Sequence, residues 1–130
     1  MIVFNSCALS KLAAACEKAL PAEACGLLLG RAEGSDRRVT DIALPSGAAG
    51  LVDGFELADH EMARMAAYAA CRGLGIVAVF HSHPTGFAGL SSYDMAAIRH
   101  SEWPWVVVTQ AGGLRLTAFA AGTAQPVAVR

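Results

Sequence analysis

Two histidines separated by a single residue are the part of this sequence best suited to chemistry. His81 and His83 close an apolar segment that begins at residue 74, and Pro84 follows at once. In a β-strand, the two-residue period points both imidazoles to the same face. Pro84 lacks the N–H that a strand needs, so it ends the ladder and leaves the pair at the mouth of the strand. The pair can therefore bind one metal ion, although two histidines that only make hydrogen bonds would give the same pattern.

Asp94, eleven residues after His83, can complete such a site. The polar start and helical spacing from Ser91 onward predict a short helix with Asp94 in its first turn, from which the carboxylate can return to the histidines. Two imidazoles and one carboxylate suit zinc, and three protein ligands leave the fourth tetrahedral position open for water. Such a water is acidified toward neutrality. The alternative is that S-x-x-D is a capping box, which only begins a helix.

The rest of the chain must provide a scaffold that positions these groups. Residues 74–83 are almost continuously apolar and β-branched, which predicts a central strand covered on both faces. Helices are expected over 7–20 and 58–72 and from Ser91. Further strands are expected over 2–5, 24–30 and 37–45, in a hairpin of 105–110 with 114–120, and as an edge strand in the final PVAVR, with a loop over 46–54. This order predicts an α/β (α+β) fold, a mixed β-sheet flanked by helices.

Length and composition limit the classes of protein to which this chain can belong. A chain of 130 residues, 55% apolar and 16% charged, fits one globular domain over residues 1–130. The formal net charge of -1 and the scattered basic residues give no electrostatic footprint for nucleic acid. No segment approaches the roughly 18 apolar residues of a membrane span. The first residues also do not resemble a secretory signal, so we expect a cytoplasmic protein with no membrane partner.

The four cysteines are far apart and form no C-x-x-C pair, which favours neither a disulfide framework nor a cysteine zinc cluster. We expect all four to be small core residues in a reducing compartment. They are Cys7, Cys16, Cys25 and Cys71.

Two blocks of the sequence together resemble the JAMM (MPN-plus, Mov34/JAB) family of zinc metallopeptidases. HSHPTGFAGLSSYD, residues 81–94, matches H-[ST]-H-P, six residues, then S-x-x-D with identical spacing. EACGLLLG, residues 23–30, is similar to the upstream block E-x-x-G-x-L-x-G of that family. The helix before the HSHP strand and the hairpin after the S-x-x-D segment also follow the family's layout. The resemblance covers nearly the whole chain and implies the JAMM/cytidine-deaminase-like arrangement of layers.

The resemblance also implies a role for each residue of the motif. His81, His83 and Asp94 would bind one catalytic zinc ion. Glu23 would take a proton from the water as general base and later deliver it to the leaving amine. Ser91 would help to stabilise the oxyanion. Spacing alone leaves Glu23 a solvated residue after a helix end, so only the family pattern brings it to the metal.

The implied substrate is a protein C-terminus. The chain is similar to the minimal prokaryotic members, which act after the Gly-Gly tail of small ubiquitin-like sulfur-carrier proteins. A Gly-Gly tail can lie extended in a narrow groove along a sheet edge. Two alternatives stay open: a non-catalytic MPN scaffold that binds protein partners, and a zinc amidohydrolase of a small molecule, although the P-C-x-x-C signature of zinc deaminases is missing.

Several other residues that could do chemistry are better explained structurally. HEMAR, residues 60–64, resembles the start of a metallopeptidase H-E-x-x-H motif, but Arg64 stands where the second histidine is required. Cys25 could be a thiol nucleophile with His81 as its base, yet its apolar strand favours a buried core residue. His100 is expected to cap a helix or lie at the surface. Packing also explains Trp103, Trp105, Met62 and Met65.

Overall fold

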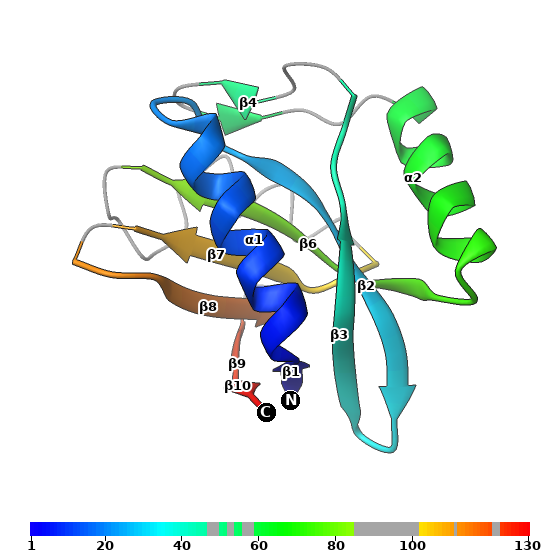
Figure 1. Ribbon diagram of the computed structural model, residues 1–130. Helices are drawn as coiled ribbons and strands as arrows, with labels where there is room; N and C mark the ends of the chain where they lie inside the picture. The colour runs from blue at the N-terminus through cyan, green and yellow to red at the C-terminus, as the bar shows by residue number, and fades with distance from the viewer. Residues whose placement is uncertain (47–49, 52–53, 56–58, 85–101, 111, 121–122) are drawn as a thin grey trace.

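The described residues form one large sheet with helices packed against it, and a short separate two-stranded ladder (Figure 1). The structure, a computed structural model, describes residues 1–130 except 47–49, 52–53, 56–58, 85–101, 111 and 121–122. In chain order the elements are β1 (Ile2–Phe4), α1 (Ser6–Ala19), β2 (Cys25–Glu33), β3 (Asp36–Ala43), β4 (Gly50–Leu51), β5 (Gly54–Phe55), α2 (Asp59–Cys71), β6 (Gly75–His83), β7 (Trp105–Thr109), β8 (Arg115–Ala120), β9 (Thr123–Gln125) and β10 (Val127–Val129).

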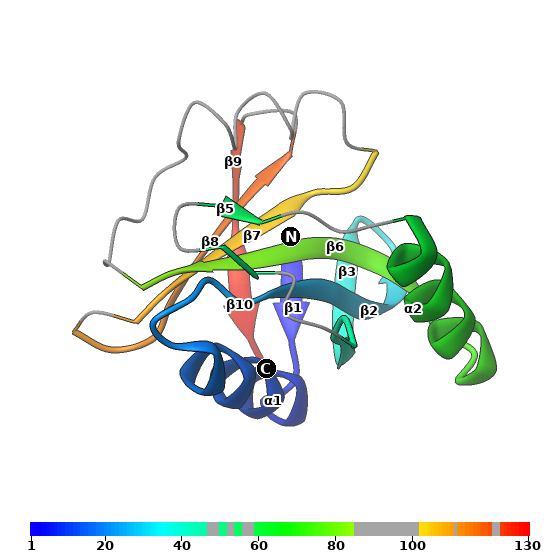
Figure 2. The same ribbon diagram turned by 90° about the horizontal axis from the view of Figure 1, so that it is seen from above.

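The large sheet is mixed, and β6 lies near its centre. Its strand order is β10-β1-β3-β2-β6-β7-β8-β9. Strand β6 is antiparallel to β2 and parallel to β7, while β1 is parallel to both β3 and β10. Figure 2 shows the sheet from above, with β6 crossing the middle of the molecule. The central position predicted for residues 74–83 is therefore confirmed.

The two helices cover opposite faces of the sheet. Helix α1 begins at Asn5, whose side chain accepts the N–H of Ala8 at 2.7 Å and so caps the first turn. Its buried residues pack on one face of the central strands with Leu28 and Phe80. Helix α2 packs Met65 against the other face. The buried α1 residues are Ala8, Leu12 and Cys16, and the second face also buries Leu27, Ala69, Val79 and Trp105.

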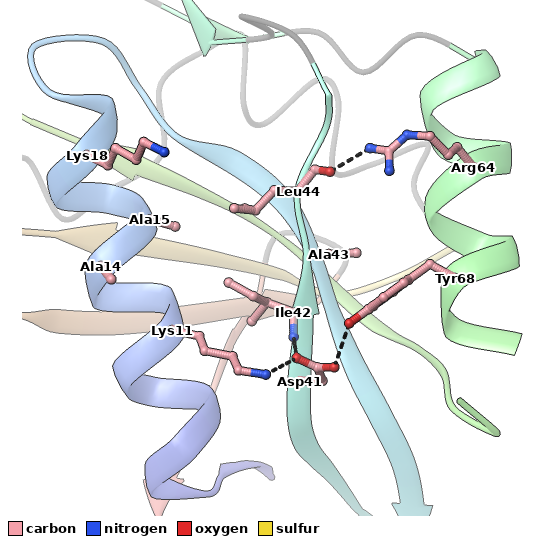
Figure 3. A pocket seen from close by; sticks show the side chains of 10 residues that line it. All are labelled: Lys11, Ala14, Ala15, Lys18, Asp41, Ile42, Ala43, Leu44, Arg64 and Tyr68. Atoms are coloured by element: carbon pink, nitrogen blue, oxygen red, sulfur yellow. Dashed lines mark hydrogen bonds and ion pairs between the residues drawn. The ribbon is translucent and has the colours of Figure 1, made fainter. Parts of the chain in front are cut away.

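A buried carboxylate joins both helices to β3. Asp41 accepts hydrogen bonds from Lys11 of α1 at 2.8 Å, from Tyr68 of α2 at 3.1 Å and from the N–H of Ile42 at 2.9 Å (Figure 3). Burial alone raises the pKa of Asp41, but the hydrogen bonds from Lys11, Ile42 and Tyr68 together hold it below its ordinary value. The ionised carboxylate therefore fixes the two helices relative to the edge of β3.

Two glycines of the upstream block allow β3 to lie close to β2. A Cβ at Gly26 would clash with the carbonyl oxygen of Ala43, and one at Gly30 would clash with the carbonyl oxygen of Arg38. Both neighbours are backbone atoms, which cannot move aside as a flexible side chain does. The glycines of E-x-x-G-x-L-x-G thus have a packing function in this chain.

Some expectations need correction. The segment 46–54, expected to be a loop, contributes to a short antiparallel ladder in which Gly50 pairs with Phe55 and Leu51 with Gly54. Strand β9 was not expected, whereas the edge strand in PVAVR is confirmed as β10. All four cysteines are free, but only Cys16 and Cys25 are buried, so the expectation of four core residues is wrong for Cys7 and Cys71, which the ends of α1 and α2 expose.

The helix expected from Ser91 lies outside the described residues. In the part of the chain that the structure describes, no helix is both long enough and apolar enough to cross a bilayer.

Candidate active site

The two histidine rings meet at the end of β6. The Nε2 atoms of His81 and His83 lie 2.9 Å apart, and the ring centroids are 4.7 Å apart. Both residues are buried. Two imidazole nitrogens on one tetrahedral zinc ion are about 3.3 Å apart, because each Zn–N bond is about 2.0–2.1 Å long. The two Nε2 atoms therefore face each other at hydrogen-bond distance on the same face of the strand, as its alternation predicts, and one zinc ion could bind both.

Ser82, between the histidines, points to the opposite face and anchors the start of β2. Its hydroxyl accepts the N–H of Ala24 at 2.8 Å, and its own N–H donates to the carbonyl of Ala24 at 2.9 Å. Ser82 and Ala24 are both buried. This reciprocal pair fixes the backbone immediately after Glu23 to the strand that carries the histidines.

Glu23 lies on the same face as the histidines. Cys25 pairs with His81 in the antiparallel ladder, and continuing that ladder two residues toward the N-terminus of β2 brings Glu23 opposite His83. Glu23 as a whole is 8% exposed, so it is not the solvated residue that spacing alone suggests. Because Ala24 packs with the α1 face and Cys25 with the α2 face, alternation assigns Glu23 to the face of Cys25 and His81. The structure thus places Glu23 on the face of the sheet that carries His81 and His83.

Buried side chains of the neighbouring strands surround the histidines. The indole of Trp105 meets the ring of His81 edge to face, with centroids 5.3 Å apart. Thr109 pairs with His83 across the parallel β6–β7 ladder and is buried. Burial, and then the charge of Glu23, raise the pKa of the Cys25 thiol to about 11. A neutral thiol is a poor nucleophile, which agrees with the expectation that Cys25 is a core residue.

Sequence reasoning missed the positional importance of Ser82, Trp105 and Thr109. Alternation along β6 already indicates that Ser82 points to the face opposite the histidines, so its position could have been predicted from the sequence. The contact between Trp105 and His81 could not have been predicted, because the sequence does not reveal the register of the parallel β6–β7 pair.

Asp94 and Ser91, the expected third ligand and oxyanion donor, lie outside the described residues, as does His100. Within the described residues, no group of three His, Cys, Asp or Glu side chains is arranged to hold a metal ion. The chemistry of the donors that are described nevertheless fits zinc: two buried imidazoles have their Nε2 atoms 2.9 Å apart, and a buried carboxylate is on the same face. A carboxylate from the segment after Pro84 would complete the set.

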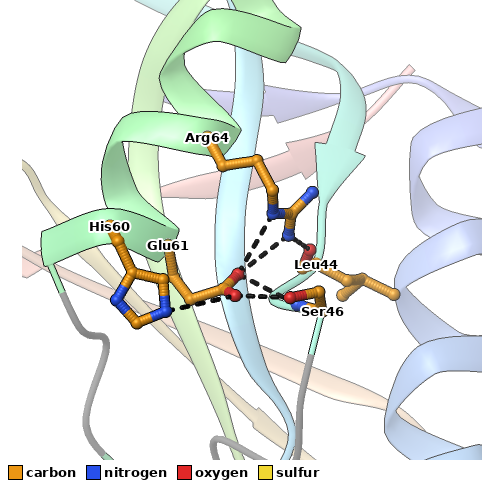
Figure 4. Close-up of polar contacts among 5 residues, drawn as sticks. All are labelled: Leu44, Ser46, His60, Glu61 and Arg64. Atoms are coloured by element: carbon orange, nitrogen blue, oxygen red, sulfur yellow. Dashed lines mark hydrogen bonds and ion pairs between the residues drawn. The ribbon is translucent and has the colours of Figure 1, made fainter.

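The other candidate histidine and glutamate of the sequence belong to a different cluster, at the start of α2 (Figure 4). Glu61 accepts hydrogen bonds from the hydroxyl and the N–H of Ser46 and from Arg64. The Ser46 contacts, followed by Arg64, lower the pKa of Glu61 to about 2. The His60 side chain is 82% exposed. Glu61 therefore joins α2 to the segment after β3.

Comparison with solved structures supports the fold. The chain is similar to a solution structure of protein DSY2949 from Desulfitobacterium hafniense, with a TM-score of 0.88 and 23% identity over 100% of this chain and 93% of that one. It is also similar to AF2198, a JAB1/MPN domain protein from Archaeoglobus fulgidus, with a TM-score of 0.68 and 14% identity over 99% and 97% of the two chains. No curated protein gives a significant match.

The family model of prokaryotic homologues of the JAB domain, Prok-JAB, matches residues 6–121. The matched range includes the upstream block at residues 23–30 and the whole of the HSHP to S-x-x-D segment. It therefore covers most of the chain and all the residues to which the motif gives a role. The chain belongs to the family of prokaryotic homologues of the JAB domain.

Proposed function

We propose that this protein is a zinc metallopeptidase that hydrolyses the amide bond after the Gly-Gly tail of a ubiquitin-like carrier protein. The observation that carries the proposal is the 2.9 Å separation of the His81 and His83 Nε2 atoms on the face of the sheet where Glu23 is buried. Asp94 is the proposed third ligand, and membership of the JAB-domain family supports the assignment. The family contains metallopeptidases and non-catalytic members, so the presence of a full set of metal ligands is what distinguishes a catalytic member.

Each residue has a distinct task in this proposal. A zinc ion bound there would supply Lewis acidity to the scissile carbonyl and lower the pKa of water. Glu23 takes one proton from the attacking water while the water oxygen bonds to the amide carbon. The same carboxyl group then gives that proton to the leaving nitrogen as the C–N bond breaks. Ser91 donates a hydrogen bond to the oxyanion, a contribution of about 3 kcal/mol in comparable sites.

The surroundings of Glu23 suit such a proton transfer. Ser82 holds the backbone next to Glu23 by two hydrogen bonds, which supports a defined position for the glutamate. Burial of Glu23 and His83 excludes bulk water, which strengthens electrostatic interactions in the site.

A Gly-Gly tail is the proposed substrate because the reactive groups lie at a strand end in a buried site. Two residues without side chains let an extended chain approach the sheet closely and deliver its last carbonyl to the metal. Bulky residues at the same positions would need space beside His83 and Glu23, both of which are buried.

The test is cleavage by zinc-loaded protein of a carrier-like peptide that ends in Gly-Gly-Ala, followed by mass spectrometry. We expect a product ending in Gly-Gly, and no product from a matched peptide with Ala-Ala at the same positions. Stoichiometric zinc without cleavage of any Gly-Gly peptide would favour a non-catalytic scaffold. Turnover of small amides alone would favour the small-molecule amidohydrolase.

A further inference from the structure

A groove of about 500 Å³ runs between the two helices along the outer edge of β3 (Figure 3). One wall is a face of α1, where Ala14 and Ala15 lie between two lysines, and the other wall is α2. The small alanine side chains leave the space open. The lining residues are Lys11, Ala14, Ala15, Lys18, Asp41, Ile42, Ala43, Leu44, Arg64 and Tyr68.

The floor of the groove is the side of β3 that faces away from β2, beyond the point where β1 stops pairing with it. Strand β1 pairs with β3 only from Arg37 to Val39, after which the chain turns at Asn5 into α1. Among the described residues, no strand pairs with Thr40–Ala43 on that side. An edge of this kind can accept an added strand.

Two side chains already form hydrogen bonds with the backbone groups that an added strand would use. The N–H of Ile42 donates to the carboxylate of Asp41 at 2.9 Å, and the carbonyl of Leu44 accepts from the guanidinium of Arg64 at 2.6 Å. Ile42 and Leu44 are two residues apart, so their polar backbone groups point to the same side. A carboxylate oxygen thus replaces a strand acceptor, and a guanidinium N–H replaces a strand donor.

Both side chains would keep partners if a strand displaced them. Asp41 would retain Lys11 and Tyr68, and Arg64 would retain Glu61 at 2.9 Å. Each displacement therefore exchanges one hydrogen bond for another and leaves no buried charge unpaired. A partner strand faces only a small energetic obstacle at this edge.

The groove also has a charge preference. Among the residues that the structure describes, four cations and two carboxylates lie in or beside it, whereas the whole chain has a formal net charge of -1. Lys18, in the last turn of α1, adds positive charge at the end nearest Leu44. The cations are Lys11, Lys18, Arg64 and Arg72, and the carboxylates are Asp41 and Glu61.

We propose that this groove binds an extended, acidic segment of a protein partner, which adds to the sheet beside Ile42 and Leu44 of β3. Its backbone would bond to these two residues, alternate apolar side chains would pack on Ala14 and Ile42, and its carboxylates would face Lys18 and Arg64. Strand β2 separates this edge from the histidines of β6, so the groove is distinct from the proposed metal site.

The test uses a labelled probe peptide in which Glu alternates with Val, measured by fluorescence anisotropy and by amide NMR shifts of the protein. We expect saturable binding with a Kd on the order of 0.1 mM or tighter, and shifts at the Ile42 and Leu44 amides. Two further probes separate the contributions: one has Lys for every Glu, and one is N-methylated at alternate residues. Each should bind at least about tenfold more weakly, because one loses the charge match and the other loses backbone donors.

The matched variants are Lys18→Glu in the groove and Arg31→Glu on β2, which change the net charge equally. Lys18→Glu should weaken binding at least about fivefold, and Arg31→Glu should change it by less than about twofold. Absence of saturable binding, equal binding of the N-methylated probe, or equal effects of the two variants would each overturn the proposal. Asp41 and Arg64 would then only protect the edge from pairing. The assay needs neither zinc nor turnover, so its result is independent of the proposed function.

Discussion

Ser82 and Ala24 are joined by two reciprocal hydrogen bonds, of 2.8 Å to the Ser82 hydroxyl and 2.9 Å from the Ser82 N–H, across 58 residues of sequence. Ser82 stands between the histidines, and Ala24 is the neighbour of Glu23. The residue that separates the two proposed ligands is therefore the one that fixes the proposed base. This geometry gives the central residue of H-[ST]-H a positioning role.

Replacing Ser82 by alanine should loosen Glu23 without removing any proposed ligand. The buried N–H of Ala24 would lose its partner, which should cost about 1–2 kcal/mol of unfolding free energy in urea titrations. We expect kcat to fall at least about tenfold while zinc content is unchanged, since misplacement of a catalytic group has that order of effect. Ser82→Thr keeps a hydroxyl and should restore most of kcat. Full kcat in Ser82→Ala would contradict the positioning role.

Glu23→Gln should abolish hydrolysis and leave both zinc binding and the fold intact. The amide has nearly the shape of the carboxylate but cannot take a proton from water, so at least about a hundredfold loss of kcat is expected. Zinc content by atomic absorption and the circular dichroism spectrum are the controls. Undiminished turnover would show that Glu23 is not the base.

Gly30→Ala should destabilise the protein strongly, since the added methyl would meet the carbonyl of Arg38 on β3. We expect a loss of at least about 2 kcal/mol in thermal or urea unfolding. Gly75→Ala is the matched control, because its Cβ would lie 3.9 Å from the carbonyl oxygen of Gly30, an ordinary contact. Equal stability of the two variants would mean that β2 and β3 do not approach as described.

Asp41 should make stability depend on pH in the acid range. Its folded pKa lies below the ordinary value of 3.8, so its contribution is complete above that value and is lost as the pH falls through the folded pKa. Asp41→Asn should therefore be about 1–3 kcal/mol less stable at neutral pH, with the difference shrinking below about pH 4. Urea titrations across this range measure it. Asp36, the first residue of β3, is half-exposed and pairs with the N-terminal amine, so Asp36→Asn is the control; an equal effect there would contradict the assignment to Asp41.

Much of the fold followed from periodicity in the sequence. The apolar run ending at His83 predicted a central strand, and the helix expected over 7–20 is observed as α1. The β4–β5 ladder was missed because glycine-rich composition indicates a loop. Cys7 and Cys71 were misplaced because residue type alone does not tell which side of a helix faces solvent.

The site was only partly predictable. Alternation alone brought His81 and His83 together, whereas the position of Glu23 depends on the antiparallel pairing of Cys25 with His81, a contact between distant segments. The groove along β3 left no sequence signal, since it arises where β1 stops pairing and two helices flank the remaining edge. Local sequence patterns thus predict individual helices and strands, whereas the sites arise from contacts between segments that are distant in the sequence.

Zinc K-edge X-ray absorption on the zinc-loaded protein and on His83→Ala tests the proposed metal site directly. We predict one zinc ion per chain with two imidazole nitrogens and oxygen ligands at about 2.0–2.1 Å, and loss of stoichiometric zinc in His83→Ala. A sulfur ligand at about 2.3 Å, which would indicate Cys25, or tight zinc retained by His83→Ala, would contradict the proposed ligand set.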